Sequence, residues 1–134
     1  MTHARATWID NFRFESVSSS NHSLVMDGDK TTASSPMELV LMALCGCTGY
    51  DVVAILKKKR EPLAGLEVRA EAVRAEGPPS AYTAIHLTYR VRGEVTPKSV
   101  EDAVRLSKEK YCSVSAMLQK TAEITSAIEY DQTA

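Results

Sequence analysis

Two cysteines, Cys47 and Cys112, stand in contexts that suit thiol chemistry. Cys47 lies in a Cys-Gly-Cys-Thr stretch in the middle of a predicted helix, and Cys112 lies at the start of a later one. The thiolate is the nucleophilic form of cysteine, so a reactive cysteine needs local positive potential. At Cys112 the backbone N–H groups of a helix N-terminus would favour a thiolate, and Lys108 and Lys110 are near it in the sequence.

Cys47 needs a cation from elsewhere, because the middle of a helix gains little from the helix dipole. The candidates are Arg13 and Arg5, which lie on predicted N-terminal strands. Cys45 precedes Cys47 by two residues, which places the two side chains about 200° apart around a helix. They therefore cannot face one site, and we assign Cys45 to the core.

Other site chemistries find little support in the sequence. The chain has no Cys-x-x-Cys motif and no histidine at zinc-finger spacing from a cysteine, so no metal site is predicted. It also has no glycine-rich phosphate loop. Its three histidines are scattered, and nothing identifies one of them as the partner of a cysteine in a hydrolase. The alternative to thiol chemistry is a set of inert core cysteines, since free cysteine is common in cores.

Length and composition indicate one domain over residues 1–134. The net charge of −1 gives no reason to expect nucleic acid as a partner. Three cysteines do not make a secreted disulfide framework, and the N-terminus lacks an apolar segment of the signal-peptide type, so we expect a cytoplasmic protein. The apolar run 39–56 is interrupted by Thr48 and Asp51 and is short for a membrane span, so we expect a buried helix and no membrane partner.

The first third of the chain predicts three short strands followed by the apolar helix. Apolar residues alternate through 3–8 and 12–15, and a third strand covers 23–26. Ser35 and Glu38 then form a capping box at the helix start. The helix is apolar on nearly every side, which predicts burial on several faces and favours a homodimer.

The rest of the chain predicts two strands, two helices and a closing strand. The signals are alternation over 66–71 and 85–92, a helix capped at Thr96-Pro97, a short helix capped at Ser113 or Ser115, and a strand over 124–130. The resulting order, β-β-β-α-β-β-α-α-β, indicates an α+β domain with mostly antiparallel strands.

Two stretches together resemble the OsmC/Ohr family, the osmotically inducible and organic-hydroperoxide-resistance proteins, and within it the YhfA-like branch. They are residues 35–48, from the capping box through Cys47, and residues 111–115 around Cys112. The similarity extends over nearly the whole chain in the order of its elements. It implies an OsmC-like fold, with a mostly antiparallel sheet packed on a long central helix, in an intertwined homodimer whose active sites lie at the subunit interface.

The resemblance also implies a thiol-dependent peroxidase that reduces organic hydroperoxides. Cys47 matches the peroxidatic cysteine, which becomes a sulfenic acid, and Cys112 matches the resolving cysteine, which condenses with it to a disulfide. A dihydrolipoamide-like dithiol then restores both thiols by exchange, and no bound cofactor is implied. Family members hold the thiolate with an arginine of the N-terminal strands, for which Arg13 is the first choice and Arg5 the second.

The chain departs from the family pattern at two places. Peroxidase members have an acid directly after the proline at the helix start, where this chain has Met37, with Glu38 one residue later. One residue turns a helical side chain by about 100°, so Glu38 is a candidate for catalysis but fits the helix cap better. A proline often follows the resolving cysteine, where this chain has Ser113. These departures favour an alternative: a non-enzymatic small-molecule-binding or redox-sensing stress protein on the same fold.

Overall fold

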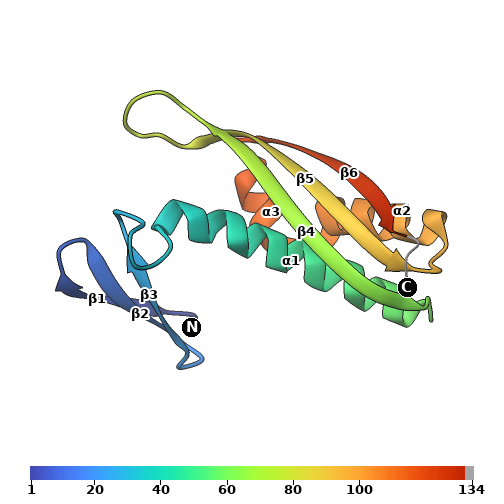
Figure 1. The fold of residues 1–134 in the computed structure, drawn as a ribbon, viewed down its shortest axis with the longest axis horizontal. Coiled ribbons are helices and arrows are strands. Elements are labelled where there is room, and N and C mark those ends of the chain that lie inside the picture. Colours follow the sequence, from blue (N-terminus) through green and yellow to red (C-terminus); the bar gives the residue numbers. More distant parts are fainter. Residues whose placement is uncertain (132–134) are drawn as a thin grey trace. The chain divides into compact units, whose positions relative to one another are not determined.

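A computed structural model describes residues 1–131, which divide into two compact units, Met1–Leu41 and a second that begins at Met42 (Figure 1). The elements in chain order are β1 (Ala4–Asp10), β2 (Arg13–Ser18), β3 (Ser23–Asp27), α1 (Pro36–Lys58), β4 (Leu63–Arg74), β5 (Tyr82–Gly93), α2 (Pro97–Leu106), η1 (Ser107–Tyr111), α3 (Ser113–Leu118) and β6 (Glu123–Asp131). The predicted order is confirmed, with the π-helical turn η1 as an addition. The expectation of one domain over residues 1–134 stays a prediction.

The first unit is built on an antiparallel sheet in the order β1-β2-β3. Its register places Trp8 opposite Phe14, and Phe14 opposite Met26. Within residues 1–41, all of which the structure describes, no apolar side chain is buried. Trp8 is 64% exposed and Phe12 is 62% exposed. This sheet therefore lacks an apolar core of its own.

Asp27 organises the turn that leads from β3 toward α1. Its carboxylate accepts hydrogen bonds from the backbone N–H groups of Asp29 and Thr32 and from the hydroxyls of Thr31 and Thr32, at 2.9 to 3.0 Å. These donors, the backbone of Thr32 first, hold the pKa of Asp27 well below its usual range. The turn after β3 is thus fixed by a carboxylate rather than by backbone alone.

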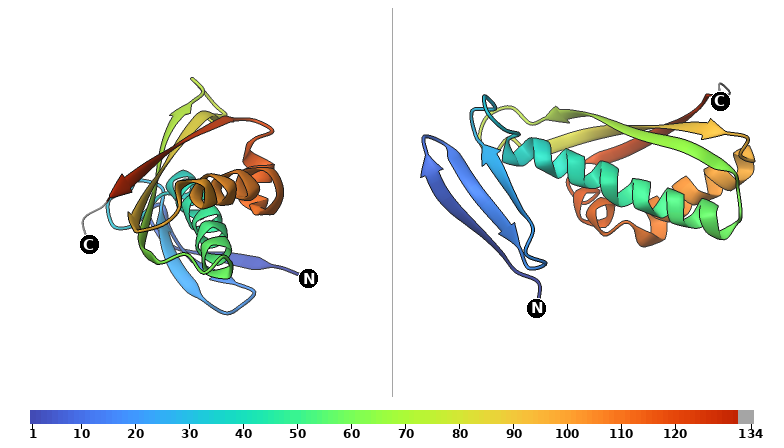
Figure 2. Two further views of the ribbon diagram at one scale, coloured as in Figure 1. Left: turned by 90° about the vertical axis from the view of Figure 1, so that its right-hand side faces the viewer. Right: turned by 60° about the horizontal axis from the view of Figure 1, so that its bottom comes forward.

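The second unit packs its helices on one face of the sheet β4-β5-β6 (Figures 1 and 2). Alternate side chains of β5 form the centre of the core, and those buried are Tyr82, Ile85, Leu87, Tyr89 and Val91. The β4–β5 pair is antiparallel, but β6 pairs with β5 in parallel. That parallel pairing was not predicted. The long return through α2, η1 and α3 makes it possible, since a parallel pair needs a crossover connection.

Helix α1 contributes one stripe to this core rather than several faces. Its buried residues are Leu44, Thr48, Val52 and Leu56, which recur every four positions. The predicted burial on several faces is therefore not found within the chain, and Met42 and Tyr50 are 56% and 74% exposed. By length and composition alone α1 could span a membrane, a test that the core helix of a soluble protein also passes.

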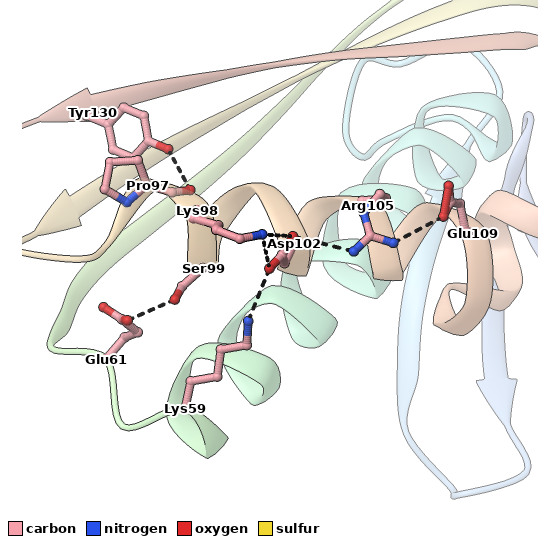
Figure 3. Close-up of polar contacts among 9 residues, drawn as sticks. All are labelled: Lys59, Glu61, Pro97, Lys98, Ser99, Asp102, Arg105, Glu109 and Tyr130. Atoms are coloured by element: carbon pink, nitrogen blue, oxygen red, sulfur yellow. Dashed lines mark hydrogen bonds and ion pairs between the residues drawn. The ribbon is translucent and has the colours of Figure 1, made fainter.

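Glu61 joins the end of α1 to the start of α2 (Figure 3). One carboxylate oxygen accepts from the backbone N–H of Thr96 at 2.8 Å, and the other accepts from Ser99 Oγ at 2.9 Å. The predicted side-chain cap by Thr96 is wrong, because its hydroxyl makes no cap hydrogen bond. A carboxylate from another segment does the capping instead.

Candidate thiol site

Helix α1 points its two cysteines to opposite sides, as the angular spacing predicts. Cys45 lines an open groove of about 650 Å³ between α1 and β4, whose walls also include Tyr50, Lys57 and Val68. It is half-buried, so its assignment to the core is wrong. Burial raises the pKa of the Cys45 thiol. Cys47 is also half-buried and lies away from this groove.

Cys112 occupies the extended residue between η1 and α3 and is 3% exposed. Its backbone N–H donates to Ser107 O at 2.8 Å, which closes the π-helical turn. Its Sγ accepts from the backbone N–H of Ser115 at 3.3 Å and so caps α3. The predicted cap by Ser113 or Ser115 is therefore wrong: the cap is the thiol itself.

Cys47 and Cys112 are neighbours in the structure, and the Cys47 side chain acts directly on the Cys112 thiol. The pKa of Cys112 is raised to about 12, chiefly by burial, and the neighbouring Cys47 side chain raises it by more than the N–H of Ser115 lowers it. The prediction that the helix N-terminus would favour a Cys112 thiolate is wrong, because desolvation outweighs a single backbone donor. Burial and the neighbouring Cys47 side chain therefore both favour the protonated form of Cys112.

The two lysines near Cys112 in the sequence are bound elsewhere. Lys108 Nζ donates to Ile124 O at 2.8 Å, so it ties η1 to β6. Lys110 Nζ lies 5.4 Å from the centre of the Tyr111 ring, within the range of a cation–π contact. Neither contact directs the ammonium group to the Cys112 sulfur, so the predicted cationic support from these residues is not found.

A buried chain of polar side chains, which the sequence did not indicate, lies beside the cysteine pair. Thr48 Oγ1 is 2.7 Å from both Tyr89 Oη and Ser107 Oγ, and Ser107 Oγ donates to Asp51 Oδ2 at 2.8 Å. Thr48, Tyr89 and Ser107 are each at most 2% exposed. The negative charge of the Asp51 carboxylate also contributes to the raised pKa of Cys112.

The remaining predicted site residues belong to the first unit. Arg13 Nη1 pairs with the carboxylate of Asp10 at 3.0 Å, while its buried Nε has no hydrogen-bond partner among the described residues. Arg5 lies on the exposed strand β1, opposite Val17.

Glu38 forms the predicted capping box with Ser35. Its Oε1 accepts from Ser35 N at 2.9 Å, and Ser35 Oγ accepts from Glu38 N at 3.2 Å. These bonds, the backbone N–H of Ser35 first, lower the pKa of the Glu38 carboxyl. Within residues 1–131, no group of three or more His, Cys, Asp or Glu side chains could hold a metal ion.

Comparison with known proteins shows which proteins the chain is similar to. The family model described as "OsmC-like protein" matches residues 27–127. Protein YhfA of Escherichia coli (strain K12) is 43% identical over 128 residues, which cover 94% of this chain and 96% of that protein.

Solved structures share the fold. A hypothetical protein from Aquifex aeolicus VF5 matches with a TM-score of 0.85 and 30% identity, over 98% of both chains. The organic hydroperoxide resistance protein OhrB of Bacillus subtilis matches with a TM-score of 0.66 and 13% identity, also over 98% of both chains, a likeness in fold alone. The predicted α+β, OsmC-like fold is confirmed, and the chain belongs to the OsmC-like protein family.

Proposed function

We propose that this protein is a thiol-dependent peroxidase that reduces organic hydroperoxides through Cys47 and Cys112. The observation that carries the proposal is that the side chains of Cys47 and Cys112, residues far apart in the sequence, interact with each other in the structure. Burial distinguishes the two roles. The buried Cys112 keeps its proton for the second step, and the half-buried Cys47 is left as the attacking cysteine. Family relatives named as organic hydroperoxide resistance proteins supply the substrate class.

The proposed cycle has three balanced steps. The Cys47 thiolate attacks the distal peroxide oxygen, the O–O bond breaks, and the alkoxide takes up a proton to leave as an alcohol. Cys112 then attacks the resulting sulfenic sulfur, the S–O bond breaks, and the Cys112 proton leaves with the hydroxyl as water. A dihydrolipoamide-like dithiol finally reduces the Cys47–Cys112 disulfide by exchange and is itself oxidised. We propose the cytoplasm as the setting, because the cycle needs a supply of reduced thiols.

We also propose that the working form is a homodimer and that Arg13 supports the Cys47 thiolate. Two features of the single chain support a dimer: the exposed aromatic side chains of β1-β2-β3 and the largely uncovered apolar helix α1. For Arg13, support comes from its unpartnered Nε and from the family resemblance. Arg5 is the second choice, because the structure gives it no comparable feature.

A second candidate function is binding of an apolar small molecule without turnover. It is favoured by the open groove beside Cys45, whose lining is mostly apolar. It is favoured also by the use of Glu38 in the helix cap, since no acid stands at position 37. Redox sensing by the same cysteine pair is a further non-enzymatic alternative, in which the disulfide forms but is not cycled.

A coupled assay separates these functions. Purified protein is mixed with cumene hydroperoxide, dihydrolipoamide and lipoamide reductase, beside Cys47→Ser and Cys45→Ser as the matched control thiol. The proposal expects turnover that is lost in Cys47→Ser and kept in Cys45→Ser. Stoichiometric oxidation without turnover would contradict it and favour the sensor. Absence of any oxidation would favour the binding protein.

The choice of arginine has its own test in the same assay. Arg13→Ala is expected to lower turnover roughly a hundredfold, the usual effect of removing one group that stabilises a reacting anion. Arg5→Ala is the matched control and is expected to keep turnover. The opposite ranking would assign the role to Arg5.

A further inference from the structure

The buried hydrogen bonds beside the cysteines, which link Tyr89, Thr48, Ser107 and Asp51, are all donated in one direction. Ser107 Oγ uses its only proton to donate to Asp51, so the 2.7 Å contact between Ser107 and Thr48 must be donated by Thr48. Thr48 has then used its own proton, so its contact with Tyr89 is donated by the Tyr89 hydroxyl. Each hydroxyl is therefore satisfied, and the chain ends on a carboxylate.

Thr48 and Ser107, the two middle residues of this hydrogen-bonded series, are each connected to the backbone of one of the two cysteines. Thr48 follows Cys47 in α1, and its side chain is fixed from two other elements, β5 and η1. Ser107 holds Cys112 through its carbonyl, which accepts the Cys112 N–H at 2.8 Å. A π-helical turn is rare and is frequently found at functional sites. Here it ends directly before the residue proposed to resolve the sulfenic acid.

We propose that Thr48 and Ser107 are positioning residues for the disulfide-forming step, because their hydroxyls, anchored on Asp51, hold Cys112 against Cys47. The inference rests on the proposed peroxidase cycle, in which Cys112 must reach the sulfenic sulfur before it is oxidised further. Neither residue touches the reacting atoms in this account. Their contribution is to keep the two sulfurs at close range, which raises the effective concentration of one thiol at the other.

The test measures that effective concentration without peroxide. The thiol pair is equilibrated with oxidised and reduced glutathione, and the fraction of Cys47–Cys112 disulfide is read by mass spectrometry. In this equilibrium the protein thiols lose two electrons and two protons, and one oxidised glutathione becomes two reduced ones. All variants carry Cys45→Ser, so only one disulfide can form within the chain.

Four variants and one control make the test specific. Thr48→Val and Ser107→Ala are expected to lower the effective concentration about tenfold or more, the change that corresponds to one buried hydrogen bond. Thr48→Ser keeps the hydroxyl and is expected to give a higher effective concentration than Thr48→Val. Tyr89→Phe removes only the hydroxyl that donates to Thr48 and is expected to lower the effective concentration by about threefold at most. Ser99→Ala is the control, since it removes a serine–carboxylate hydrogen bond of similar length on α2 (Figure 3) and is expected to leave the equilibrium unchanged.

Thermal unfolding of each variant is recorded alongside, and the equilibrium is measured where the variant is folded. A lower unfolding temperature with an unchanged disulfide equilibrium in Thr48→Val and Ser107→Ala would overturn the proposal. An equal loss in Ser99→Ala would overturn it too. If Thr48→Val does not fold, Ser107→Ala decides.

The peroxidase function and the positioning role can be contradicted separately. A wild-type protein that forms the disulfide with glutathione but reduces no hydroperoxide would contradict the peroxidase function and leave the positioning role standing. Peroxide turnover at the wild-type rate in variants whose disulfide equilibrium is also unchanged would contradict the positioning role alone.

Discussion

The thiol of Cys112 lies beside the side chain of Cys47, and burial, together with this neighbour, raises its pKa to about 12. The two cysteines come from separate parts of the chain, and the buried one, Cys112, keeps its proton. This arrangement suits a pair in which one sulfur attacks first and the other follows.

The first prediction concerns the order of alkylation. With iodoacetamide near neutral pH, Cys47 is expected to react before Cys112, because Cys112 is 3% exposed and held as a thiol. Peptide mass mapping over time measures the two rates, with a urea-unfolded sample as the control in which they should converge. Faster modification of Cys112 in the folded protein would contradict the assigned roles.

The second prediction concerns stability at alkaline pH. The folded state raises the pKa of Cys112 from 9.0 to about 12, so the unfolded chain ionises first as pH rises. The stability due to the protonated, buried thiol is therefore fully present below pH 9 and is lost as pH climbs toward 12, by up to about 1.4 kcal/mol per pH unit. Urea unfolding of the wild type and Cys112→Ala between about pH 8 and 10.5 should show the wild type losing more stability. Parallel curves would contradict the prediction.

The third prediction separates capping from catalysis at Glu38. Glu38→Gln keeps an acceptor for Ser35 N and is expected to keep both the unfolding temperature and the peroxide turnover. Glu38→Ala loses that acceptor and is expected to lower the unfolding temperature with little change in turnover per folded molecule. A large loss of turnover in Glu38→Gln, without loss of stability, would instead assign the carboxylate a role in catalysis.

The fourth prediction uses Trp8, the single tryptophan, as a probe of dimer formation. In the isolated chain Trp8 is 64% exposed on a sheet without an apolar core, so a dimer that covers this sheet should shift its emission to shorter wavelength. The emission is expected to move back on dilution, in step with the molar mass from light scattering. Trp emission that does not depend on concentration, in a chain of monomer mass, would contradict the dimer.

Much of the site could be predicted from local sequence patterns. The angular spacing of Cys45 and Cys47 on a helix shows that only one of them can face Cys112, and the capping box explains Glu38. Both arguments involve residues less than one helical turn apart, where geometry depends on the backbone alone. The alternation of apolar residues likewise predicts where the strands lie.

What could not be predicted depends on tertiary packing. The high pKa of Cys112 arises from burial, which its position at a helix start does not report. The contacts of Thr48 with Tyr89 and Ser107 join residues on three elements, and nothing in the local sequence marks them. The parallel pairing of β5 with β6 depends on how the chain returns to the sheet, not on the pattern within either strand.

The central claim is that Cys47 and Cys112 act as one redox pair toward an organic hydroperoxide. The direct measurement is a single addition of one equivalent of cumene hydroperoxide to the reduced protein, followed by acid quench and peptide mass mapping. We predict a Cys47–Cys112 cross-linked peptide in the wild type, and in Cys112→Ser a sulfenic acid on Cys47 that dimedone traps. Peroxide that stays unconsumed, or oxidation that falls on Cys45 and persists in Cys47→Ser, would contradict the account.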